Sequence, residues 1–176
     1  IALGLALLLN QPLRGMRAFR TIFFLPSLVT GVAVAILWGM TLGPEYGIVN
    51  RVIGWFGVTG PLWFNSPAWS KPALVLMSFW GVGGSMIIFL AGLQGVPRQL
   101  YEAAEIDGAG RWKRFVHVTL PMLSPTVFFV LVVGVIGSFQ VFTQAFVVSG
   151  GLGGPLDSTL FYVFHIYRQA FEHFQM

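Results

Sequence analysis

Hydrophobic residues lie in three long runs without any charge, and short polar stretches separate these runs. The runs cover residues 21–44, 72–97 and 118–156. A transmembrane helix needs about 20 consecutive apolar residues to cross the hydrocarbon layer, so each run is long enough for one crossing. The pattern predicts spanning helices at 21–43, 73–95 and 121–148, the last one ending before a glycine-rich segment.

The first nine residues, Ile1 to Leu9, form a shorter apolar run. Nine helical residues rise only about 14 Å, against about 30 Å of hydrocarbon. A signal peptide would carry a basic segment before the run and a small-residue cleavage site after it, and this pattern is missing. We therefore expect a partial span at 1–9, and one all-α, polytopic membrane domain over residues 1–176 that is truncated at both ends.

Basic residues are unevenly distributed over the connections between the runs. Seven lysines and arginines lie in 10–20 and 98–114, against three at Arg51, Lys71 and Arg168. Connections rich in basic residues stay in the cytoplasm, so the first and third connections are expected inside and the second outside. Three spans that alternate in direction give the same orientation, which predicts a multi-pass protein of a cytoplasmic membrane.

Composition supports a membrane protein and argues against several kinds of enzyme. The chain is 56% hydrophobic and 9% charged, with a mean hydropathy of +0.78, whereas soluble domains are roughly 25% charged. The chain has no cysteine, its six acidic residues lie outside the apolar runs, and His117, His165 and His173 lack the spacing of metal ligands. Thiol, acid–base and metal-dependent catalysis therefore have no candidate residues. The net charge of +4 is attributed to basic residues that set the orientation in the membrane, and not to nucleic-acid binding.

Two segments outside the runs have an amphipathic or aromatic pattern. Gly47–Gly57 places apolar residues at helical spacing opposite Asn50 and Arg51, which predicts a short helix on the outer face. An interfacial anchor is one interpretation of this helix, and contact with an external partner protein is the other. Phe161–Phe174 is similar, and we expect a helix at or entering the outer interface.

Charged residues are concentrated between the second and third runs, where seven fall within 98–114. One short helix is expected from Pro97 to Ile106, because proline suits the first helical position. A second is expected at Arg111–Val118, before Pro121 opens the next span. Between them, Gly108 can take the left-handed conformation that ends a helix, at low cost.

This charged strip has two interpretations. It is either a solvated linker whose charges set topology, or an ordered element with an apolar side formed by Trp112, Phe115 and Val116. Exposed apolar patches on ordered elements usually mark an interface.

The motif in the strip favours the second interpretation. Glu102-Ala103-Ala104 is followed after three residues by Gly108, and after nine more by Val118-Thr119-Leu120-Pro121. This order resembles the EAA loop of permease subunits of binding-protein-dependent ABC importers, where isoleucine usually stands in place of Val118. Other segments are similar to the sugar-type branch of that family, including the maltose and glycerol-3-phosphate permeases: RTIFFLP at 20–26, FLAGLQGVP at 89–97 and TLPMLSP at 119–125.

The resemblance implies a permease of the bacterial cytoplasmic (inner) membrane, with one further helix before this chain and one after it. It implies that the loop 97–120 couples the permease to a separate ATPase through Glu102, Ala103, Ala104, Asp107, Gly108 and Pro121. The implied partners are ABC ATPase subunits, a second and usually different permease subunit, an extracytoplasmic solute-binding protein and the lipid bilayer, with no nucleic acid. ATP and its Mg²⁺ would be held by the ATPase, because this chain lacks the G-x-x-x-x-G-K-[ST] loop and is expected to hold no cofactor.

Neutral polar residues within the runs mark two candidate segments for substrate passage. Gly81, Gly83, Gly84 and Ser85 interrupt one run, and Ser138 and Gln140 lie in the next. Glycines in a span indicate either close helix packing or local unwinding that exposes backbone groups to a cavity. The polar side chains suit a sugar or polyol, although they can equally bond neighbouring helices; the resemblance implies that both segments line the passage.

The resemblance therefore implies ATP-driven import of a sugar or related polyol by a chain that is not itself an enzyme. A self-contained secondary transporter or channel is the alternative, but ion coupling would need charged residues in the spans, and the runs have none. A membrane scaffold is a second alternative, and it would not need an ATPase dock. The glycine-rich segment 149–159 lacks the lysine of a phosphate-binding loop, and we expect it to be a flexible docking or hinge loop on the outer face.

Overall fold

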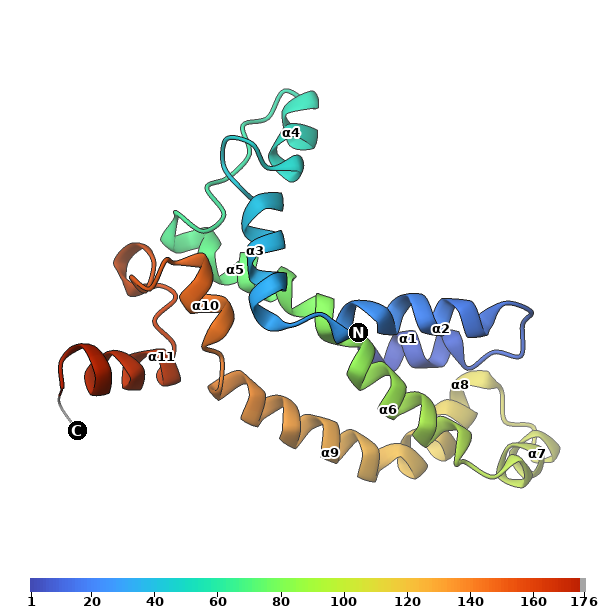
Figure 1. The fold of residues 1–176 in the computed structure, drawn as a ribbon. Helices are drawn as coiled ribbons and strands as arrows, with labels where there is room; N and C mark the ends of the chain where they lie inside the picture. The colour runs from blue at the N-terminus through green and yellow to red at the C-terminus, as the bar shows by residue number, and fades with distance from the viewer. Residues whose placement is uncertain (175–176) are drawn as a thin grey trace. The chain divides into compact units, whose positions relative to one another are not determined.

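The computed structural model describes residues 1–174, and the regular elements in that range are all helical (Figure 1). The α-helices are α1 (Ala2–Leu9), α2 (Met16–Phe24), α3 (Gly31–Thr41), α4 (Ile48–Trp55), α5 (Pro67–Ser78), α6 (Val82–Gln94), α7 (Arg98–Ile106), α8 (Arg111–Arg114), α9 (Leu120–Phe139), α10 (Thr143–Val148) and α11 (Tyr162–Tyr167). Short 3₁₀ turns lie at Leu25–Leu28, Phe79–Gly81 and Pro155–Asp157, and π turns at Phe115–Thr119 and Arg168–Glu172. The all-α fold class predicted from the sequence is confirmed.

Within the described residues, two helical stretches are long and apolar enough to cross a membrane, Pro67–Gln94 and Arg111–Val148. They cover the predicted spans at 73–95, except for its last residue, and 121–148, but each begins earlier than predicted. The stretch Pro67–Gln94 begins after Ser66, with Pro67 at its first helical position. Serine before a helix and proline at its first position are both common. The absence of charge is therefore a poor guide to where these helices begin, since Lys71 lies inside α5.

The first predicted span is not one continuous helix. The run forms two helical pieces, Met16–Leu28 and Gly31–Thr41, separated by extended backbone at Thr30. Pro26 explains the weakening of the first piece, because proline has no N–H to donate to the carbonyl four residues earlier, and the helix tightens to a 3₁₀ turn there. The expectation of an unbroken helix at 21–43 was wrong, and a single crossing by the two pieces together remains a prediction.

The chain is divided into two compact units, and each is described by itself. The first unit contains Ile1–Leu28 and Gly81–Val135. In it α1 and α2 run side by side (Figure 1), and α1 packs against α6 around Ala6, Leu9, Met86 and Leu90. Leu123 of α9 completes this core.

The second unit contains Val29–Trp80 and the described residues from Ile136 onward. Its main core joins α3 to α5 through Val34, Ala35, Leu74 and Met77. α3 also lies against α10, where Gly31 contacts the side chains of Thr143 and Gln144. Aromatic side chains pack α10 against α11, in a cluster formed by Phe142, Phe146, Phe164 and Tyr167.

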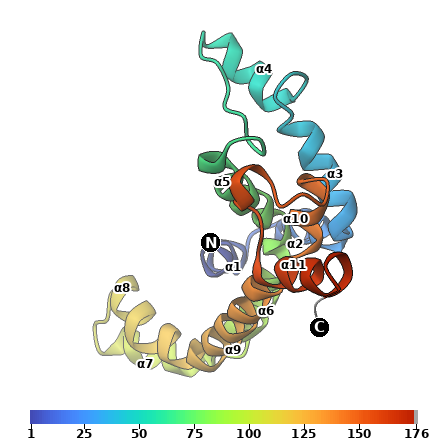
Figure 2. The same cartoon turned by 90° about the vertical axis from the view of Figure 1, so that its left-hand side faces the viewer.

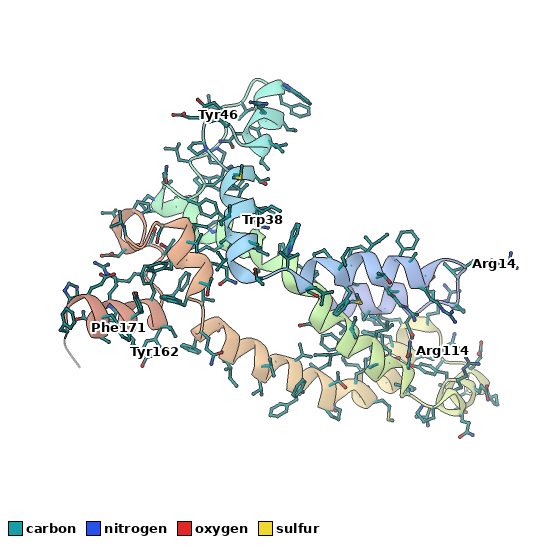
Figure 3. All side chains as sticks on the ribbon, viewed as in Figure 1. Arg14, Trp38, Tyr46, Arg114, Tyr162 and Phe171 are labelled. Carbon is teal, nitrogen blue, oxygen red and sulfur yellow. The ribbon has the colours of Figure 1, made fainter. Side chains whose placement is uncertain are left out.

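The predicted amphipathic helix at Gly47–Gly57 is present as α4. Asn50 of α4 bonds to the segments on both sides of the helix. Its amide donates to the carbonyls of Pro44 and Pro61, and its side-chain oxygen accepts from the indole N–H of Trp63 at 2.8 Å. Trp55 at the end of α4 is 82% exposed, and Tyr46 before α4 projects away from the chain (Figure 3). An interfacial anchor has this form, although its contact with lipid remains a prediction.

Candidate functional site

The first arm of the charged strip is α7, and it ends as the sequence predicts. Pro97 precedes the helix in extended conformation, and the helix stops after Ile106. Gly108 has a φ of +73°, its N–H donates to the carbonyl of Glu105, and the N–H of Ala109 donates to that of Ala104 at 2.8 Å. These two bonds form a Schellman motif, in which a left-handed residue closes the last turn. The prediction for Gly108 is confirmed.

The second arm begins at Arg111, but it does not end before the apolar run. α8 continues through a π turn at Phe115–Thr119 into α9, so the predicted break before Pro121 was wrong. In an α-helix the ring of Pro121 would clash with the carbonyl of His117. A π turn, which bonds each N–H to the carbonyl five residues earlier, moves that carbonyl aside, and the N–H of Leu120 donates to Phe115. The helix therefore passes through the proline.

Two side-chain interactions join the arms, and sequence reasoning missed both. The hydroxyl groups of Tyr101 on α7 and Thr119 in the π turn lie 2.9 Å apart. Nearer the tip, Arg114 forms an ion pair with Glu105 at 3.1 Å. Figure 2 shows α7 and α8 side by side, and Figure 3 marks Arg114 beside α7. The strip is thus an ordered helical hairpin, which we call the coupling hairpin (residues 97–120).

Most of the candidate coupling residues are accessible on the coupling hairpin. Glu102, Ala103, Asp107 and Gly108 are exposed and Ala104 is half-buried. Pro121 lies inside α9, where it acts on the helix geometry. Two large apolar side chains are also exposed beside the turn, namely Ile106, at 87%, and Trp112. The expected apolar side is partly present, because Trp112 packs against Phe115 with ring centroids 5.7 Å apart.

His117 is exposed on the same hairpin. Its Nδ1 lies 3.0 Å from the carbonyl of Lys113, one helical turn earlier. Over residues 1–174, no group of three or more His, Cys, Asp or Glu side chains is placed to hold a metal ion. The chemistry available on the hairpin is therefore carboxylate, hydroxyl, cation and apolar contact, which suits a protein partner.

The first candidate passage segment stays helical. A 3₁₀ turn at Phe79–Gly81 leads directly into α6, and Gly83 is buried against the main chain of Phe23 and Phe24. Gly81 and Gly84 have no atom within 4 Å of the position where a Cβ would lie. Close packing therefore explains Gly83, whereas Gly81, Gly84 and the half-buried Ser85 border open space.

The second candidate passage segment lies where a helix is interrupted. The predicted helix at 121–148 is divided into α9 and α10 by a break at 140–142, where Phe142 adopts non-helical φ and ψ of −135° and −66°. Ser138 and Gln140 are both exposed at this break. This segment and Gly81–Ser85 belong to different units, and so each is described by itself.

The glycine-rich outer loop is ordered by hydrogen bonds and one ion pair. Gly150 and Gly151 close α10 with a second Schellman motif, in which the N–H of Gly151 donates to the carbonyl of Phe146 at 2.9 Å. Asp157 has a positive φ of +53° and accepts from Arg168 at 3.4 Å. The loop thus has a defined path, although its expected docking role is untested.

Comparison with known proteins identifies the family of this chain. A family model described as "Binding-protein-dependent transport system inner membrane component" matches residues 1–172. The chain belongs to this family. The permease fold and the inner-membrane location expected from the sequence are therefore confirmed.

Similar proteins are permeases of ABC transporters. The chain is 44% identical to the probable ABC transporter permease protein YesP of Bacillus subtilis (strain 168), covering 99% of this chain and 57% of YesP. It is 39% identical to the lactose transport system permease protein LacF of Rhizobium radiobacter, covering 98% of this chain and 59% of LacF. The chain therefore spans less than two thirds of the length of either relative.

A solved structure shares the fold over almost the whole chain. It is a bacterial alginate ABC transporter in complex with an alginate pentasaccharide-bound periplasmic protein. The TM-score is 0.84 at 28% identity, covering 99% of this chain and 61% of the matched chain. The two chains therefore share an arrangement of helices.

Proposed function

We propose that the full-length protein is the membrane-spanning permease subunit of an ATP-driven ABC importer. In this proposal residues 1–176 form one transmembrane permease domain, and the coupling hairpin binds a separate ATPase subunit that holds ATP and Mg²⁺. The permease does no covalent chemistry. It alternates between outward-facing and inward-facing states, and the ATPase and an external binding protein favour different states.

The observation that carries this proposal is the coupling hairpin itself. It is an ordered, cross-bonded element that exposes Glu102, Ala103 and Gly108 together with Ile106 and Trp112. An ordered apolar tip with carboxylates beside it fits a protein groove better than it fits water. A solvated linker would need neither the Schellman turn nor the two side-chain bonds between the arms.

A sugar or related polyol is the substrate class that we favour. Its support is the lactose transport system permease and the alginate ABC transporter among the similar proteins, together with the neutral polar residues of the two passage segments. Gly81, Gly84, Ser85, Ser138 and Gln140 are the proposed passage residues, whereas Gly83 serves helix packing. An external solute-binding protein and a second permease subunit complete the proposed complex.

The experiment compares two glycine variants of the full-length protein, assembled with its partner subunits in proteoliposomes. Gly108→Val forces a side chain onto a left-handed residue, and should uncouple ATP hydrolysis from uptake. Gly110→Val is the matched control, because Gly110 has a φ of −65° and open space around it. Coupled uptake that is unchanged by Gly108→Val would count against the proposed dock, and uptake that needs no ATP would favour a secondary transporter.

A further inference from the structure

The chain connections of α7 contain glycine on both sides. Gly95 lies in the turn before α7, and Gly108 and Gly110 lie in the turn after it. Pro97 restricts the first connection, and the Schellman bonds at Gly108 close the second. Side-chain bonds to the second arm add to these constraints on the orientation of α7.

Of the two side-chain bonds that leave α7, one is much better protected from water. Glu105, the partner of Arg114, is 68% exposed, and exposed ion pairs are weak and screened by salt. Thr119 is only 5% exposed, and its hydroxyl lies 2.9 Å from that of Tyr101. The bond is partly shielded from water, and its breakage leaves the buried Thr119 hydroxyl without this partner.

Either hydroxyl can donate in this bond. A hydroxyl has one proton to donate and two lone pairs to accept with. The main-chain carbonyl of Arg114, 3.5 Å from the Thr119 hydroxyl, is a much more distant acceptor. Removing either hydroxyl therefore breaks the bond.

The π turn is what brings Thr119 to face α7. Residues five positions apart in an α-helix differ by about 140° around the axis. In a π turn, such residues lie above one another, because each N–H bonds to the carbonyl five residues earlier. Arg114 and Thr119 are five positions apart across the π turn, and both face α7.

We infer that Tyr101 and Thr119 are positioning residues that pass the displacement of α7 to α9. This inference rests on the proposed function, in which the ATPase moves the coupling hairpin. α9 begins at Leu120, directly after Thr119, so the bond makes α7 and the start of α9 move together. Without the bond, one direct link between α7 and the start of α9 is lost, and less of the displacement reaches α9.

The test uses three nearly isosteric variants of the full-length protein, assembled with its partner subunits: Tyr101→Phe, Thr119→Val and the double variant. The readouts are the amount of ATPase subunit retained, the rate of ATP hydrolysis and the uptake per ATP hydrolysed. We expect the ATPase to be retained and hydrolysis to continue, while uptake per ATP falls about fivefold in each single variant. The double variant should fall no further, because both single changes remove the same bond.

Two controls separate coupling from general damage. Tyr46→Phe removes a phenolic hydroxyl from a side chain that is 79% exposed, and should leave the uptake per ATP hydrolysed unchanged. Thr119→Ser keeps the hydroxyl and should restore most of the uptake per ATP hydrolysed. A merely structural defect would lower the amount of complex and both rates together, and the ratio would stay constant.

The results that would overturn the inference are distinct from those that would overturn the proposed function. A wild-type ratio in Tyr101→Phe and Thr119→Val, or an equal defect in Thr119→Ser and Thr119→Val, contradicts the inferred link and leaves the importer standing. A wild-type complex that shows no ATP-driven uptake contradicts the proposed function before any variant is compared.

Discussion

Gly83 of α6 packs against the main chain of Phe23, so closely that a Cβ at residue 83 would overlap with the carbonyl oxygen of Phe23. Gly84, the next residue, has no atom within 4 Å of its own Cβ position. The two adjacent glycines therefore have different roles. The first allows two helices to approach, and the second borders open space.

Alanine at these two positions should have opposite effects on stability. Gly83→Ala should lower the free energy of unfolding by about 1–3 kcal/mol, because the contacted atoms belong to the backbone and cannot move aside easily. Gly84→Ala should be neutral or stabilising by up to about 1 kcal/mol, since alanine favours a helix. Denaturant titration of the detergent-solubilised protein measures both changes. Equal losses in the two variants would contradict this difference between the glycines.

Arg20 should contribute to stability through the end of α1. Its guanidinium donates twice to the carbonyl of Leu9, at 2.7 and 3.2 Å, where the helix end carries a partial negative charge. Arg20→Gln should lower the free energy of unfolding by about 1–2 kcal/mol, because a charged hydrogen bond is lost. Arg17→Gln, at an exposed neighbouring arginine, is the control and should change stability little. A similar loss in both variants would indicate a general effect of charge.

Asn50 should hold the α4 loop in place. In Asn50→Ala the carbonyls of Pro44 and Pro61 and the indole N–H of Trp63 lose their partner. We expect amide hydrogen exchange over residues 44–63 to become about tenfold faster, because the loss of these hydrogen bonds favours local opening. The exposed Asn65 offers a control in Asn65→Ala. Unchanged exchange in Asn50→Ala would show that apolar contacts alone hold the loop.

Pro121 should act through the π turn and not through contact with a partner. Pro121→Ala restores an N–H that can donate to His117, so the π turn can return to α-helical geometry. Thr119 and Arg114 would then no longer face α7 together, and uptake per ATP should fall. Pro125→Ala is the control, because Pro125 also lies inside α9 but beyond the turn. If both variants keep the wild-type ratio, the alignment of the two arms does not depend on this proline.

Local signals in the sequence were sufficient for several elements. Gly108 follows a run of helix-forming residues, and only a residue that tolerates a positive φ can close the turn there. The helix at Ile48–Trp55 has apolar residues at helical spacing, and the long apolar runs require burial in helices. These predictions succeed because each depends on neighbouring residues.

Features that depend on distant or cooperative contacts could not be predicted. The bond between Tyr101 and Thr119 requires a π turn, and neither residue signals one. The break at Thr30 and the break at 140–142 lie inside charge-free runs, so the charge pattern does not mark them. Gly83 and Gly84 look the same in the sequence, and the packing of Phe23 alone distinguishes them.

The central claim, that the coupling hairpin binds an ABC ATPase subunit, is tested most directly by cross-linking in native membranes. Residues 1–176 contain no cysteine, so Ile106→Cys introduces a single thiol once any cysteine elsewhere in the full-length protein is replaced. A photoreactive maleimide on this exposed residue should capture an ABC ATPase subunit, identified by mass spectrometry. The same probe at Trp55→Cys on α4 should not. Capture of no ATPase at residue 106, or equal capture at both positions, would contradict the account.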